Sequence, residues 1–103
     1  RLTTVAQGVA ASMAGILLQA GDVRVMGRES YLLIHEIQAG ILGSFGEISD
    51  RVKWLELVQN RILDIFANRS KLSKAELKKK WSRTDWWLDS DEALKLGIVD
   101  EVR

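Results

Sequence analysis

The chain has 103 residues, of which 47% are hydrophobic and 28% are charged, a composition typical of one globular domain. Its formal net charge is only +1, which provides no extended positive field for binding nucleic acid or an anionic membrane. The absence of cysteine and the single histidine exclude a disulfide framework and a cysteine nucleophile, and argue against a zinc cluster. We therefore expect neither a metal nor a cofactor.

The sequence shows no apolar segment of the length that crosses a membrane and no signal-peptide pattern. The longest mainly apolar stretch runs from Val9 to Leu18, well below the roughly 20 residues that span a bilayer. No basic segment followed by an apolar one opens the chain, as a signal peptide would. These features predict a cytoplasmic protein, or one in an equivalent reducing compartment, with no membrane contact.

The first quarter of the chain alternates between strand and helix signals. The run from Arg1 to Val5 favours a strand, Gly8 breaks it, and the Ala, Leu and Met residues from Ala10 to Ala20 favour a buried helix. Gly21 is placed to end that helix as its C-cap glycine. A second strand is predicted from Val23 to Met26.

The next apolar run ends at the only histidine. After a turn at Gly27 to Ser30, the residues from Tyr31 to His35 form an unbroken apolar segment, which favours a strand covered on both faces. His35 lies at its carboxyl end, where functional groups gather in α/β sheets. The glycine-rich segment from Glu36 to Gly46 reads as a loose connection.

A long helix is predicted from Glu47 to Ala67, because apolar residues recur there at steps of three and four. Trp54 and Leu57 lie off the main apolar stripe, so the helix has more apolar surface than one packing face requires. This pattern predicts a second partner surface.

Capping signals mark two shorter helices. Ser73 and Glu76 have the spacing of a capping box, and Asp89 and Glu92 repeat it before a helix at Ser90 to Leu96.

The remaining segments favour strands. The aromatic run from Thr84 to Leu88 favours an extended segment, and Ile98 with Val99 favours a last short strand. Helices interleaved with apolar strands predict an α/β layered domain.

Ser12, His35 and Asp85 are the residues of a possible nucleophilic triad, which needs a hydroxyl at a strand-to-helix turn, an imidazole at a strand end and a carboxylate to orient the ring. Each also has a plain structural reading. Spacing alone favours Ser12 as a helix cap. A lone histidine at a strand end is more often a hydrogen-bonded core residue, and an aspartate before two tryptophans is usually a turn or capping residue. Asp89 reads better as an N-cap.

Three motifs at these residues resemble the ClpP family of serine peptidases. The segment from Gly8 to Gly21 resembles the family's nucleophile pattern G-x-A-A-S-M followed by small and aliphatic residues. Leu33 to His35 resembles the strand that ends in the catalytic histidine. Thr84 to Leu88 and Glu92 to Asp100 resemble the R-D-x-F/W-x segment and the E-A-x-x-x-G-L-V-D ending. The motifs occur in the family's order and cover nearly the whole chain.

The resemblance implies a ClpP/crotonase-like layered fold and a role for each residue. Ser12 would be the nucleophile, His35 the general base and then general acid, and Asp85 the carboxylate that fixes the imidazole tautomer. The backbone N–H of Met13 would be one oxyanion donor. The family also implies stacked heptameric rings, an ATP-driven AAA+ unfoldase as partner and unfolded polypeptide as substrate.

Two departures from the family accompany the resemblance. Most members follow the histidine with Gln-Pro, whereas this chain has Glu36 and Ile37 and no proline. Family members also have a further N-terminal region of similar size, with a glycine-rich strand that gives the second oxyanion donor. Residues 1–103 are therefore interpreted as the C-terminal part of a single ClpP-like domain.

Two other classes compete with the peptidase. The crotonase superfamily of acyl-CoA hydratases and isomerases shares the implied fold and a similar chain ending, but typically lacks a serine at the position of Ser12. A non-catalytic ring or assembly subunit would not need a triad. A phage or prophage peptidase of the same fold also fits the motifs.

Overall fold

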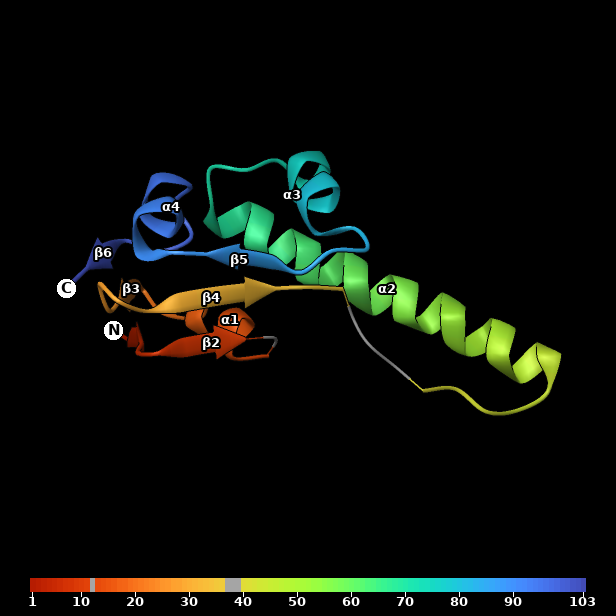
Figure 1. Ribbon diagram of the computed structural model, residues 1–103. Helices are drawn as coiled ribbons and strands as arrows, with labels where there is room; N and C mark the ends of the chain where they lie inside the picture. Colours follow the sequence, from red (N-terminus) through yellow and green to blue (C-terminus); the bar gives the residue numbers. More distant parts are fainter. Residues whose placement is uncertain (12, 37–39) are drawn as a thin grey trace.

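The computed structural model describes residues 1–11, 13–36 and 40–103. These residues form two three-stranded sheets and four helices, so the predicted α/β layered class is confirmed (Figure 1). No helix of the described residues combines the length and hydropathy that a membrane span requires.

The first sheet is entirely parallel. It consists of β1 (Thr3–Ala6), β3 (Val23–Met26) and β6 (Glu101–Val102), with β3 in the middle. The strand predicted at Ile98 and Val99 is wrong. Both side chains are buried, but their N–H groups donate to the carbonyl oxygen of Ala93. Those bonds close the end of the preceding helix, and the strand forms only at β6.

The second sheet has β4 (Tyr31–Ile34) in the middle. β2 (Val9–Ala11) pairs with β4 in parallel and β5 (Trp86–Leu88) pairs with it antiparallel. The helix predicted to begin at Ala10 is therefore wrong at its start, because pairing with β4 outweighs the helix propensity of alanine. The expectation that β4 is covered on both faces is also wrong, since its residues alternate between buried and exposed.

The two sheets are joined at Gly8. Its φ of +78° lies in the left-handed region that glycine adopts without strain. The Gly8 N–H donates to Oγ of Ser30 at 2.9 Å, and its carbonyl accepts from the Tyr31 N–H at 2.8 Å. These bonds tie the β1–β2 connection to the turn that leads into β4, and so fix where β2 and β4 begin.

Four helices pack around the sheets: α1 (Met13–Leu18), α2 (Phe45–Arg69), α3 (Lys74–Trp81) and α4 (Ser90–Lys95). The capping box of Ser73 with Glu76 is confirmed at the start of α3, as is the Asp89 cap at the start of α4. Gly21 does not adopt a positive φ, so its predicted role as a C-cap is wrong. A Cβ at this position would collide with the side chain of Thr4.

α2 extends far beyond the body of the molecule (Figure 1). A helix of its 25 residues is about 37 Å long, and its buried residues are Leu63 and Phe66, both near its carboxyl end. The predicted exposure of surplus apolar surface is confirmed, because Trp54 and Leu57 are 64% and 61% exposed. The amino-terminal half of α2 therefore presents apolar side chains away from the core.

Arg24 of β3 is the centre of a buried polar network. Its guanidinium binds both carboxylate oxygens of Asp100, at 3.0 Å through Nε and 2.8 Å through Nη2. Nη1 donates to Oε1 of Gln19 at 2.7 Å and to the carbonyl oxygen of Arg69 at 2.5 Å. The amide of Gln19 in turn donates to the carbonyl of Ile98. One side chain thus joins β3, the end of α1, the end of α2 and the C-terminal segment.

This network makes stability depend on pH in the acid range. The side-chain hydrogen bond from Arg24 lowers the pKa of Asp100 from 3.8 to about 2, against the opposing effect of burial. Because the folded pKa lies below the unfolded one, the pair stabilises the fold fully above pH 3.8 and loses this contribution as the pH falls toward 2.

We expect Asp100→Asn to weaken that acid dependence. At neutral pH the substitution should cost roughly 1–3 kcal/mol of unfolding free energy, because it removes charge-assisted bonds to Arg24. Urea unfolding over a series of pH values from about 5 to about 2 should then show a shallower loss of stability in the variant than in the native chain. Equal losses in both would contradict this role for Asp100.

Candidate active site

Three strand ends meet at one edge of the second sheet. β2 ends at Ala11 and β4 ends at Ile34, and because the two are parallel their carboxyl ends lie on the same side. β5 runs the opposite way, so its first residue, Trp86, lies at that edge as well. In Figure 1 this is the edge of the sheet beside which α2 extends outward.

His35 and Asp85 flank the last paired positions of β4 and β5. The ladder pairs Leu33 with Trp87 and Ile34 with Trp86. The ladder ends there, and one further step in the same register would set His35 opposite Asp85. Directly opposed residues of antiparallel strands lie on the same face, with Cα atoms roughly 4.5–5.5 Å apart. A continued register would therefore bring together two residues that are 50 positions apart in the sequence.

The same alternation identifies the face on which the two residues lie. Ile34 and Leu88 point into the core and are at most 3% exposed, whereas Tyr31 and Trp87 are about half exposed on the opposite face. Continued alternation would place His35 and Asp85 on that same face, where His35 is half-buried and Asp85 is exposed.

The imidazole of His35 is held by a backbone carbonyl. Its Nδ1 lies 2.6 Å from the carbonyl oxygen of Glu36, and a carbonyl can only accept, so Nδ1 carries the proton. That tautomer places the basic lone pair on Nε2, as a general base requires. Sequence reasoning assigned the orienting role to Asp85 alone and missed this carbonyl, whose only signal was its adjacency to His35.

The predicted nucleophile, Ser12, lies outside the described residues. The residues around it have the expected arrangement, because β2 ends at Ala11 and α1 begins at Met13. Met13 is the first residue of α1. The first N–H groups of a helix have no acceptor within the helix, so the Met13 N–H is of the kind that can donate a hydrogen bond to an oxyanion. The side chain of Met13 is 61% exposed.

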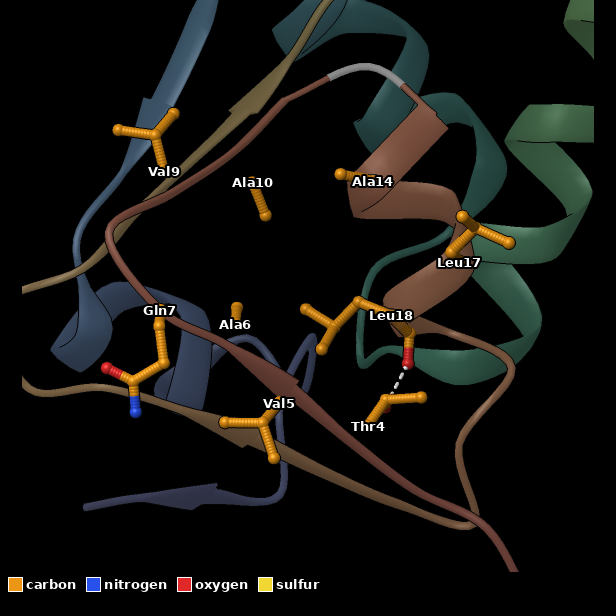
Figure 2. A pocket seen from close by; sticks show the side chains of 9 residues that line it. All are labelled: Thr4, Val5, Ala6, Gln7, Val9, Ala10, Ala14, Leu17 and Leu18. Atoms are coloured by element: carbon orange, nitrogen blue, oxygen red, sulfur yellow. Dashed lines mark hydrogen bonds between the residues drawn. The ribbon is translucent and has the colours of Figure 1, made fainter.

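A hollow of about 320 Å³ lies between β1, β2 and α1. Figure 2 shows Ala6, Ala10 and Ala14 around it, where larger side chains would fill the space. The hydroxyl of Thr4 donates to the carbonyl of Leu18 at 2.7 Å and closes one end. The alanines of β1, β2 and α1 therefore leave the surface open beside α1.

Metal ligation has no evident site in the part of the chain that the structure describes, since no three His, Asp or Glu side chains there are grouped to hold an ion.

The family model for Clp protease matches residues 1–103, the whole of the chain. The chain belongs to the Clp protease family. Curated relatives include the ATP-dependent Clp protease proteolytic subunit of Deinococcus radiodurans, 30% identical over 98% of this chain. Proteolytic subunit 2 of Tropheryma whipplei is 31% identical over 99%, and the subunit of Bacteroides fragilis is 32% identical over 98%.

The match covers all or nearly all of this chain but only part of each relative. The chain spans about half the length of the curated relatives, covering 50% of the Deinococcus protein and 57% of the Tropheryma protein. The family assignment favours the peptidase interpretation over the acyl-CoA alternative. The fold it implies agrees with the two layered sheets described above.

Proposed function

We propose that this chain is part of a serine endopeptidase subunit of the ClpP type, with Ser12, His35 and Asp85 as its catalytic triad. The observation that carries the proposal is the β4–β5 register, whose continuation opposes His35 and Asp85. The match of the Clp protease family over the whole chain supports it. So do the names of the relatives, each a proteolytic subunit.

The chemistry would proceed by acyl transfer. Ser12 Oγ attacks the scissile carbonyl while Nε2 of His35 takes the hydroxyl proton, giving a tetrahedral oxyanion that accepts a hydrogen bond from the Met13 N–H. The C–N bond then breaks as His35 returns the proton to the leaving amine. Water, deprotonated by the same imidazole, hydrolyses the acyl-enzyme. Asp85 stabilises the imidazolium formed in each half.

We further propose that residues 1–103 are the C-terminal part of one catalytic domain. The chain matches about half of each relative, and a triad peptidase normally uses two oxyanion donors, of which this chain offers the Met13 N–H. The rest of the subunit would supply the second. The partners proposed from the family are copies of the same subunit in stacked heptameric rings and an ATPase unfoldase that delivers unfolded polypeptide in the cytoplasm.

Ser12→Ala tests the nucleophile. In the complete subunit, a fluorophosphonate probe should label the native protein at Ser12, because only an activated serine attacks the phosphorus. The substitution should abolish labelling and lower peptide turnover by up to roughly 10⁶-fold. Mass spectrometry of the labelled peptide is the measurement, and labelling elsewhere with activity retained would refute the triad.

Asp85→Asn separates the third triad member from the acidic residues near it. It should lower turnover by about 10⁴-fold, because an amide favours the wrong imidazole tautomer. Asp89→Ala is the matched control. Its Oδ1 accepts from the Glu92 N–H at 2.8 Å, so its loss should cost about 1 kcal/mol of stability and little turnover. If the two effects were exchanged, Asp85 would not be the orienting carboxylate.

The apolar face of α2 supports assembly. A hollow of about 470 Å³ lies on the helix surface, lined by Trp54, Leu57, Val58, Asn60, Arg61 and Asp64. Large exposed apolar side chains beside a surface hollow are typical of a protein interface. We propose that α2 of the facing ring covers this surface, with the projecting half of each helix crossing between the rings.

Introducing charges on this face should split double rings into single rings. Trp54→Glu combined with Leu57→Lys replaces two apolar side chains of the proposed interface by charged ones, and burying a charge is costly. The net charge does not change. The control is Lys53→Glu with Glu56→Lys, which has the same spacing and net charge on neighbouring polar positions. Analytical ultracentrifugation of the complete subunit should show halved particles for the first variant only. An active monomer in the native protein would contradict the assembly.

A further inference from the structure

Glu36 joins the segment that carries His35 to the segment that carries Asp85. Its side-chain Oε1 accepts a hydrogen bond from the backbone N–H of Arg83. The two residues are 47 positions apart, and each lies just outside the β4–β5 ladder, whose last pair is Ile34 with Trp86. The bond therefore spans the two chain segments that diverge beyond the sheet.

The backbone at Arg83 needs such support. Its φ of +58° is the only positive value at a non-glycine residue in the part of the chain that the structure describes, and this region is sterically unfavourable for an L-residue. Residues persist there when neighbouring contacts hold them. A carboxylate that accepts from the Arg83 N–H supplies one such contact.

The turn around Arg83 is fixed at its other side by α3. The Ser82 N–H donates to the carbonyl of Lys78, and the Thr84 hydroxyl donates to the carbonyl of Lys80 at 3.0 Å. The last residue of α3, Trp81, is 1% exposed and anchors the helix in the core. The turn is thus tied to α3 on one side and, through the Glu36 bond, to the segment after β4 on the other.

We propose that Glu36 is a positioning residue that holds Asp85 opposite His35. The Ile34–Trp86 pair fixes the two strands on one side of the proposed catalytic pair, and the Glu36–Arg83 bond fixes them on the other. His35 itself binds the Glu36 carbonyl, so one residue controls both the ring and the turn that delivers Asp85. The inference rests on the proposed peptidase function.

Glu36→Ala and Glu36→Gln, made in the complete subunit, form the test. The amide oxygen of Gln accepts from an N–H as a carboxylate does, so Gln keeps the bond whereas Ala loses it, and both remove the same charge. Glu36→Ala should lower kcat by roughly 10- to 100-fold with KM little changed, because displacing a catalytic group by about 1 Å has an effect of that size. Glu36→Gln should remain within a few-fold of the native kcat.

Amide hydrogen exchange gives a second readout that does not depend on activity. The Arg83 N–H should exchange at least tenfold faster in Glu36→Ala than in Glu36→Gln, because only the alanine variant leaves it without its acceptor. Equal exchange rates, or equal kcat values for the two variants, would overturn the positioning role. Fluorophosphonate labelling of Ser12 in the native subunit shows whether a negative result concerns Glu36 alone or the peptidase proposal as well. Labelling with equal variants refutes the role of Glu36 alone, and no labelling refutes both.

Discussion

A buried cation organises this fold. The guanidinium of Arg24 is removed from water, and an unpaired charge there would cost several kilocalories per mole. The chain must therefore bring it acceptors, and these come from parts of the sequence as distant as Gln19, Arg69 and Asp100. The carbonyl of Arg69 lies at the negative end of α2, where a cation is also favoured by the helix dipole. Satisfying one side chain thus fixes where α1 and α2 end and where the C-terminal segment returns.

The proposed site depends on β4 being the middle strand of the second sheet. A strand with neighbours on both sides cannot shift register without breaking two ladders, so its end is well defined. Parallel pairing with β2 and antiparallel pairing with β5 bring the end of one neighbour and the beginning of the other to the edge where β4 ends. Residues beyond that edge are not held by the ladder. Further hydrogen bonds, such as the one from the Arg83 N–H to Glu36, hold them instead.

Local signals predicted the elements well where they depend on nearby residues. The capping box of α3, the Asp89 cap of α4 and the period of α2 act within a few positions, and these three features agree with the structure. The failures have different causes. Ala10 and Ala11 pair with the distant strand β4, whereas the N–H groups of Ile98 and Val99 close the end of α4 on the carbonyl of Ala93. At the site, residue types indicated His35 and Asp85 as candidates. The β4–β5 register and the bond from His35 to the carbonyl of Glu36 are long-range or backbone features that no side-chain pattern encodes.

In the proposed triad, the carbonyl of Glu36 and the carboxylate of Asp85 would have different roles toward His35. The neutral carbonyl of Glu36 can fix the Nδ1–H tautomer, but its partial charge stabilises an imidazolium far less than a full carboxylate does. A carboxylate opposite the ring adds that stabilisation when the proton arrives, which is when the transition state needs it. Because Asp85 is exposed in this chain, its charge would be screened by water until substrate or further protein covers the edge. The proposed catalytic strength of this site would thus depend on burial that the described residues do not themselves provide.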